Sequence, residues 1–210
     1  MDMVAMDLQF RRAVPSDVEE AIPLIYSSGP HEGDYVCVVG RHTTVDFLRI
    51  AFVGVSNLYG CGAHAVAVLD GHVVGIGAFR NGAKYNRETL ETVGPILRVY
   101  GPLTGLGVFR RAMHLNKLMP PPKKDELIIQ DLGVREDMRG KGIGTALLTH
   151  QIELARSQGF RRCILDVAVT NPRAQALYER LGFRVVKERK WHIKGSAVRV
   201  PDQRRMELTM

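Results

Sequence analysis

The segment Arg139-Gly140-Lys141-Gly142-Ile143-Gly144-Thr145 has the composition of a loop that binds an anion. Glycines allow the backbone to approach a ligand closely, and successive N–H groups at the start of a helix attract phosphate. Arg139 and Lys141 add positive charge beside these groups. The spacing excludes two common phosphate loops, because a Walker loop needs Gly-Lys-Ser/Thr after four residues and the dinucleotide fingerprint needs G-x-G-x-x-G. The segment therefore predicts an anion site of another kind.

A second group of residues that could do chemistry lies between positions 171 and 183. Asn171 before a proline is typical of a helix start, and Gly182 is typical of a helix end. Asn171 can be interpreted equally as a plain N-cap or as a ligand contact. The ring of Tyr178 is expected to pack, since it shares a helix face with three apolar residues (Ala174, Leu177 and Leu181). Its hydroxyl could in addition transfer a proton.

Hydrophobic periodicity predicts the elements that hold these two groups. The anion loop follows a strand expected over residues 127–134 and precedes a helix expected over 142–158, which Gly159 ends. Residues 163–169 have almost no polar alternation, as in a buried strand. The second group follows this strand directly.

The remaining pattern predicts a mixed sheet with helices. Asp70-Gly71 between two β-rich runs, 65–69 and 72–79, is a two-residue hairpin turn. Thr43 or Thr44 could cap a helix, and Ser16 with Glu19 has capping-box spacing. The polar, glycine-rich stretch 27–40 is expected to be a loop. Further strands are expected over 8–11, 183–191 and 204–210, and further helices over 16–26, 87–100 and 103–118, the last two interrupted at Gly94-Pro95 and Gly101-Pro102.

Both groups are similar to the cofactor signatures of the GNAT superfamily of acetyl-CoA-dependent N-acetyltransferases. The first match is Leu132-x-Val134 with Arg139-x-x-Gly142-x-Gly144, and the second is Asn171-Pro172-Arg173-Ala174-x-x-Leu177-Tyr178-x-x-x-Gly182-Phe183. The resemblance covers about residues 127–190. It implies a single N-acetyltransferase domain over 1–210 with a mixed α/β, GNAT-like fold: about seven mostly antiparallel strands with flanking helices, splayed between strands 4 and 5. A helical insertion at about 80–125 would separate strands 3 and 4.

The resemblance also implies how the residues act. Acetyl-CoA would lie between the splayed strands, and a primary amine would attack it directly in a ternary complex. Gly133 is the expected bulge that starts the splay, and a backbone N–H of this strand would stabilise the oxyanion. Tyr178 would protonate the departing thiolate. The implied cofactor-binding residues are Leu132, Gly133, Val134, Arg139, Gly140, Lys141, Gly142, Ile143, Gly144, Thr145, Asn171, Arg173, Ala174 and Tyr178, and no metal is expected.

The residue that takes the proton of the amine is less well defined. Gln130 falls among positions where several branches of the family carry a glutamate, and an amide accepts a proton poorly. Asp131 is therefore the candidate catalytic base, although it is equally interpreted as a structural hydrogen-bond acceptor. The alternatives are Glu126, His31, Glu32, Asp34 and His114.

The charge of the expected insertion bears on the acceptor. Residues 81–122 contain six basic side chains and two acidic ones (Lys84, Arg87, Arg98, Arg110, Arg111 and Lys117 against Glu88 and Glu91). This excess disfavours a polyamine and favours an acceptor with a carboxylate or phosphate beside its amine. A small molecule is favoured over a protein.

Composition sets the remaining expectations. A net charge of +7 suits a polyanionic ligand such as CoA, whereas 7% aromatic residues offer little stacking surface to nucleic acid. Three cysteines and the absence of a secretory segment favour the cytoplasm, and no apolar run suits a membrane. A catalytically silent acyl-CoA-binding sensor is the alternative function. Formation of a homodimer is left open.

Overall fold

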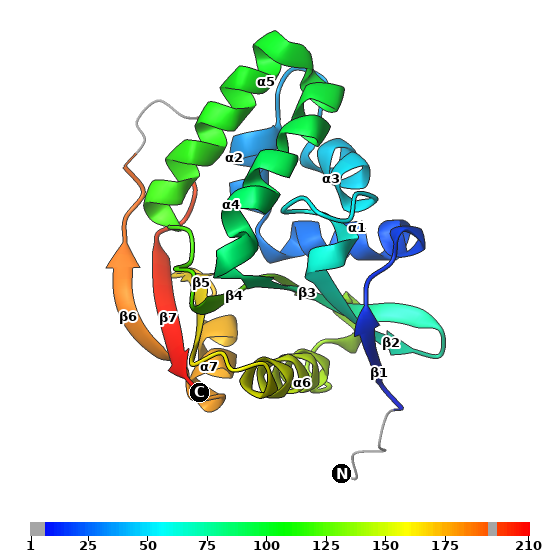
Figure 1. Ribbon diagram of the computed structural model, residues 1–210, viewed down its shortest axis with the longest axis vertical. Helices are drawn as coiled ribbons and strands as arrows, with labels where there is room; N and C mark the ends of the chain where they lie inside the picture. The colour runs from blue at the N-terminus through cyan, green and yellow to red at the C-terminus, as the bar shows by residue number, and fades with distance from the viewer. Residues whose placement is uncertain (1–6, 193–196) are drawn as a thin grey trace.

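Seven strands form one open sheet in the order β1-β2-β3-β4-β5-β7-β6 (Figure 1). The computed structural model describes residues 7–192 and 197–210. β4 and β5 run parallel, whereas the other neighbouring strands are antiparallel. The predicted fold class is therefore confirmed. The strands are β1 (Gln9–Arg12), β2 (His64–Leu69), β3 (His72–Asn81), β4 (Glu126–Val134), β5 (Arg162–Ala168), β6 (Arg184–Arg189) and β7 (Gln203–Thr209).

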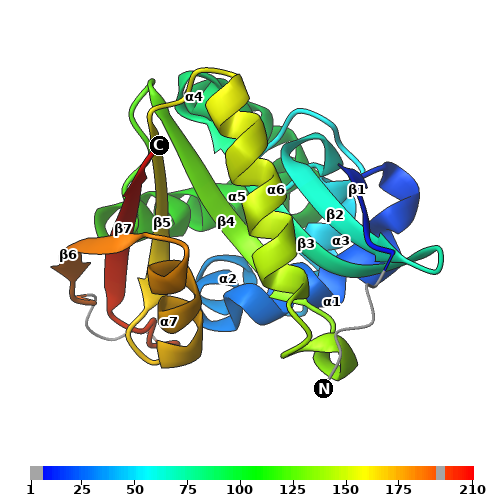
Figure 2. The ribbon, with the colours of Figure 1, turned by 90° about the horizontal axis from the view of Figure 1, so that it is seen from below.

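Helices cover both faces of this sheet (Figures 1 and 2). One face carries α1 (Val18–Ser28), α2 (Pro30–Cys37), α3 (Thr44–Phe52), α4 (Gly82–Glu91) and α5 (Val93–Leu118), and the other carries α6 (Ile143–Ser157) and α7 (Pro172–Arg180). Each layer has its own apolar core, with Ile22 and Phe47 buried on the first side and Leu148 and Leu165 on the second. None of the helices in the described ranges has the length and apolar content needed to cross a bilayer.

Helix α2 corrects the prediction that residues 27–40 form a loop. Pro30 occupies its first position, where a missing N–H costs no helical hydrogen bond. Tyr35 and Cys37 are buried, and the hydroxyl of Tyr100 in α5 donates to the Cys37 carbonyl over 2.7 Å. Packing against α5 thus stabilises a short helix that its glycine-rich, polar sequence does not indicate.

The two predicted helix caps have different outcomes. Thr43 caps α3 as expected, because its Oγ1 accepts from the Asp46 N–H over 3.2 Å while Asp46 accepts from the Thr43 N–H over 2.9 Å. The capping box predicted for Ser16 and Glu19 is wrong. Asp17, in a 3-10 turn before α1, accepts from the Val14 N–H over 2.8 Å instead.

The helical segment between β3 and β4 begins earlier than predicted. The side chain of Asn81 accepts from the Ala83 N–H over 2.8 Å and caps α4. The break expected at Gly94-Pro95 lies slightly earlier, at Thr92 between α4 and α5. Pro95 therefore falls in the first turn of α5, where no N–H is needed. The break at Gly101 is present: its φ of 69° and ψ of 175° turn the chain between two helical halves. The second half consequently runs back over α2.

The sheet opens between β4 and β5, next to a bulge in β4. Cα pairing between the two strands stops at Ile129 and Leu165, although both strands continue. The pairing of β4 with β3 shifts between Gln130 and Gly133, and Asp131 in the extra position has a φ of 56°. Aspartate tolerates this left-handed conformation better than most residues. The bulge is therefore at Asp131, not at Gly133 as predicted.

Gly133 has a different structural role. A Cβ at this position would lie 2.3 Å from the carbonyl oxygen of Leu24 in α1, which is closer than atoms can approach. Glycine here allows α1 to pack directly on the opened part of β4. This close packing brings α1 and the start of α2 to the opening.

Candidate active site

A cavity follows the opening of the sheet between β4 and β5. Its volume is about 630 Å³. Residues 129–134 of β4 and 165–168 of β5 line its middle. At one end are Arg139, Gly144 and the start of α7, and at the other are the inner faces of α2, α3 and α5. The cavity therefore connects the predicted anion loop with a chamber under the helices.

The anion loop presents free backbone donors at the start of α6. Gly140 and Gly142 have φ values of 77° and 84°, which favour glycine. The first helical bond is donated by Ala146, so the N–H groups of residues 141–145 have no partner in the described part of the chain. Arg139 lies across the end of β4, with its Nε donating to the Val134 carbonyl over 3.1 Å. The arrangement can bind a phosphate group without side-chain rearrangement.

Helix α7 brings two predicted residues to the opposite wall. Asn171 accepts from the Ala174 N–H over 3.1 Å through Oδ1, so it is an N-cap and also lines the cavity. Tyr178 is 8% exposed and contacts the ring of Phe183 edge-on at 6.1 Å. Burial raises the pKa of the Tyr178 phenol to about 12. Since its hydroxyl has no hydrogen-bond partner among the described residues, it stays protonated and free to donate.

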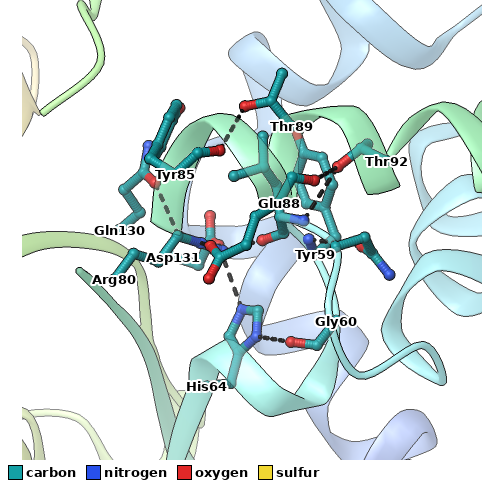
Figure 3. Close-up of polar contacts among 12 residues, drawn as sticks. Tyr59, Gly60, His64, Arg80, Tyr85, Glu88, Thr89, Thr92, Gln130 and Asp131 are labelled. Atoms are coloured by element: carbon teal, nitrogen blue, oxygen red, sulfur yellow. Dashed lines mark hydrogen bonds and ion pairs between the residues drawn. The ribbon is translucent and has the colours of Figure 1, made fainter. Parts of the chain in front are cut away.

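Asp131 lies at the centre of a polar network on the floor of the chamber (Figure 3). Arg80, at the end of β3, donates to Gln130 over 2.8 Å and to Asp131 over 3.2 Å, and also contacts the Leu58 carbonyl. Burial by itself would raise the pKa of Asp131, but the hydrogen bond from His64 and the charge of Arg80 outweigh it and lower the pKa. A carboxyl group held in this way is a weak proton acceptor.

His64 connects this network to the start of β2. Its ring is buried, with Nδ1 2.8 Å from the Gly60 carbonyl and Nε2 3.3 Å from the Asp131 carboxylate. A carbonyl can only accept, so Nδ1 carries a hydrogen. Through these two contacts His64 links the Gly60 turn to the bulge in β4. This arrangement further commits the carboxylate of Asp131 to structural contacts.

Glu32 has a different environment on the opposite wall. It lies in the first turn of α2 and accepts from Nε2 of Gln203 over 2.7 Å. Gln203 pairs with Ala168 at the open end of β5. Burial raises the pKa of Glu32 more than its hydrogen bonds lower it. No ion pair to a lysine or arginine is formed by this carboxylate within residues 7–192 and 197–210.

The structure gathers most, not all, of the predicted site residues at the cavity. Those in its wall are Asp131, Leu132, Gly133, Val134, Arg139, Gly144, Asn171, Arg173, Ala174 and Tyr178. Gly140, Lys141 and Gly142 lie on the exposed loop before α6, and Thr145 is exposed in the first turn of that helix. The side chain of Ile143 is buried in the core beneath the loop. Of the alternative bases, Glu32 and His31 line the cavity, whereas Glu126, Asp34 and His114 do not.

Two features of the site were missed. Arg80 and His64 were assigned no role, because an arginine ending an apolar strand and a lone histidine starting one carry no local signal.

The six basic residues of the helical segment do not line the cavity. Five are exposed, and Arg111 contacts the Val38 carbonyl over 3.3 Å. The expectation of an acidic acceptor assumed that these basic side chains face the ligand, and in this structure they do not. Within the described residues, no three His, Cys, Asp or Glu side chains gather as metal ligands would.

The open sheet, the loop of free amides and the cavity between splayed strands define a class of proteins that bind an extended, phosphate-bearing ligand across the sheet. Comparison with known proteins identifies the class further. The family model described as the acetyltransferase (GNAT) family matches residues 55–183. This chain belongs to that family, whose members are acyltransferases with acetyl-CoA as cosubstrate.

Individual relatives match shorter segments. An uncharacterized N-acetyltransferase of Methanocaldococcus jannaschii is 42% identical over 73 residues, which are 35% of this chain and 30% of that protein. The L-methionine sulfoximine/L-methionine sulfone acetyltransferase of Pseudomonas aeruginosa is 42% identical over 52 residues, 25% of this chain and 30% of its own length. The match thus spans about a third of each curated relative.

The fold itself extends over almost the whole chain. The N-acetyltransferase from Staphylococcus aureus Mu50 superimposes with a TM-score of 0.66 over 95% of this chain and all of that one, at 17% identity. At this identity the likeness concerns the fold. It is consistent with the strand order and with the opening between β4 and β5 described above.

Proposed function

We propose that the chain transfers the acetyl group of acetyl-CoA to a primary amine by direct attack in a ternary complex. The observation that carries this proposal is the continuous cavity from the free amides at the start of α6, through the opened strands, to the chamber under α2, α3 and α5. Such a path suits a ligand whose pyrophosphate and thioester ends are far apart. The acceptor enters from the chamber and meets the thioester at the opening.

The residues in this path take distinct roles. The N–H groups of residues 141–145 bind the pyrophosphate, with Arg139 and Lys141 adding positive charge. Leu132, Gly133 and Val134 face the pantetheine arm and the thioester, and a backbone N–H of β4 stabilises the oxyanion. The start of α7, with Asn171, Arg173 and Ala174, contacts the arm from the other side. Gly140, Gly142, Ile143, Gly144 and Thr145 provide the backbone shape of the anion site.

Tyr178 acts as the general acid. Its phenol, with a pKa of about 12, stays protonated at neutral pH and can donate to the thiolate as the C–S bond breaks. Asp131 was the expected base. Its lowered pKa and its contacts with Arg80 and His64 support a positioning role instead, in which it holds the bulge and the floor of the chamber.

The proposal includes one N-acetyltransferase domain over residues 1–210, in which the helical segment 80–125 is an insertion that closes the acceptor chamber. Residues of α5 line that chamber, and the kink at Gly101 directs them toward α2. The acceptor is a small molecule, which is supported by the helices α2, α3 and α5 that line the chamber.

A catalytically silent acyl-CoA sensor is the second candidate, since Gln130 replaces the glutamate expected in several branches of the family. Release of CoA thiol separates the two functions. With acetyl-CoA and a panel of primary amines, the proposal predicts amine-dependent thiol release with equimolar N-acetylated product. Binding of acetyl-CoA with no product from any amine would support the sensor.

A further inference from the structure

The carboxylates that line the acceptor chamber in the described part of the chain differ in their partners. Arg80 is matched by Asp131, and Asp166 is held by two bonds from Arg205, at 2.6 and 3.0 Å. Glu32 is half-buried, forms no ion pair with a lysine or arginine among the described residues, and accepts one hydrogen bond, from the neutral amide of Gln203. The neighbouring His31 is the basic group that acts on it. Burying a carboxylate without a cation is costly, so proteins retain one where a ligand supplies the positive charge.

Beyond Glu32 the chamber is largely apolar. Its walls come from helices α1 to α5. Among the described residues that line the cavity, the arginines are Arg80, paired on the floor of the chamber, and Arg139 and Arg173 at the other end, beside the anion loop and α7. An acceptor that carried its own carboxylate or phosphate would have no free cation to bind it there. The apolar wall residues are Val36, Phe47, Leu48, Ile96, Val108, Phe109, Met113 and Leu115.

We propose that the acceptor is an apolar primary amine, an arylalkyl- or branched alkylamine without an acidic group, whose ammonium is bound and deprotonated by Glu32. This inference rests on the proposed function and reverses the expectation of an acidic acceptor. The apolar body of the amine packs on α3 and α5. The ammonium points toward the start of α2 and the open end of β5.

The proton balance of the step is complete. Glu32 takes one proton from the ammonium and gives it to solvent after turnover. The neutral nitrogen then attacks the thioester carbonyl, forming the C–N bond, and the C–S bond breaks. The thiolate takes the proton of Tyr178, and the proton lost by the amide nitrogen restores that phenol. The products are the N-acetylamine, CoA thiol and one released proton, and no oxidant or further reactant is needed.

The first test compares matched acceptors with the full chain and acetyl-CoA. 2-Phenylethylamine and 3-methylbutylamine are compared with their α-carboxylated counterparts, phenylalanine and leucine, and with spermidine. The inference predicts a kcat/KM at least about 100-fold higher for each apolar amine, because an unpaired buried charge costs several kcal/mol. A preference for phenylalanine, leucine or spermidine overturns the inference while the proposed function stands.

The second test concerns Glu32 itself. Glu32→Gln is expected to lower kcat/KM for 2-phenylethylamine by about 10²- to 10⁴-fold, the range for loss of a general base, with acetyl-CoA affinity unchanged. Glu32→Asp should recover part of this loss. Glu153→Gln, on the exposed face of α6, is the matched control. Wild-type kinetics in Glu32→Gln would overturn the role of Glu32.

The same assays separate this inference from the proposed function. Acetyl-CoA is titrated in a thermal unfolding assay alongside the kinetics. Binding without turnover of either apolar amine overturns the inference and leaves an acyl-CoA site. No binding, together with no thiol release from any amine, refutes acetyl transfer itself.

Discussion

Replacement of Tyr178 by Phe removes the proposed general acid with little other change to the structure. The hydroxyl has no hydrogen-bond partner among the described residues, and the ring packs on Phe183. Removing an unpaired buried hydroxyl should not weaken folding, so we expect the free energy of unfolding to change by less than about 1 kcal/mol. Acetyl-CoA affinity should change by less than about threefold, because the hydroxyl acts on charge that develops only in the transition state.

The expected kinetic loss is much larger. A positioned general acid contributes about 10²- to 10⁴-fold, which corresponds to about 2.7 to 5.4 kcal/mol of activation free energy. Thiol release measured at saturating acetyl-CoA gives this loss as a fall in kcat. Tyr35→Phe is the matched control, because Tyr35 is also buried but packs on Trp191 outside the cavity wall. Equal losses in turnover and acetyl-CoA affinity for Tyr178→Phe would refute the assignment and leave a packing role.

Three further predictions concern stability, each checked by urea unfolding. Gly133→Ala should lower the free energy of unfolding by about 2 to 3 kcal/mol, because the added Cβ would clash with Leu24. Gly107→Ala is the control, since a Cβ there meets nothing within 4 Å, and it should raise the free energy of unfolding by about 0.5 to 1 kcal/mol. Equal effects of the two substitutions would contradict the close packing of α1 on Gly133. Asp131→Asn should cost about 3 kcal/mol, because it removes the nearer of the two carboxylates beside the buried guanidinium of Arg80 and leaves only Glu88, 3.9 Å away. No change in the free energy of unfolding would show that the Arg80–Asp131 ion pair does not stabilise the fold. Glu32→Gln should stabilise the fold at pH 7.5, because the pKa of Glu32 is raised in the folded state and its ionised form therefore costs folding energy above that pKa. This gain in the free energy of unfolding should vanish near pH 4, where the wild-type carboxyl is protonated in the folded and the unfolded state. A gain that is constant with pH would exclude this cause.

Local signals predicted the parts of the fold that local chemistry determines. Asp70-Gly71 turns the hairpin of β2 and β3, Thr43 caps α3, and Asn171 caps α7, each through contacts within a few residues. The anion loop was recognisable for the same reason, since its glycines and its position before a helix are contiguous in sequence.

Features that depend on distant contacts could not be predicted. Helix α2 forms because Tyr100 and its neighbours in α5 pack on it, and nothing in residues 27–40 reports this. His64, Arg80 and Asp131 come from three different strands. Their network therefore forms only when these strands pair in the native register. The sequence indicated a structural role for Gly133. Whether this glycine forms a β-bulge or allows the close approach of α1 depends on where that helix lies.

Composition did not indicate where the basic side chains of the helical segment lie. The basic excess of the helical segment is real, but the helices turn those side chains to solvent and their apolar faces to the chamber. Counting charges along a segment does not indicate which of them face a ligand. The unpaired carboxylate of Glu32 is visible only when all partners in the cavity are known.

The central claim is that the cavity and the free amides at the start of α6 bind acetyl-CoA. Thermal unfolding of the full chain with increasing acetyl-CoA tests it most directly. At about 100 times the dissociation constant, binding should stabilise the native state by about 2.7 kcal/mol, which raises Tm by roughly 5 to 11 °C for a chain of this size. An unchanged Tm at millimolar acetyl-CoA would contradict the account.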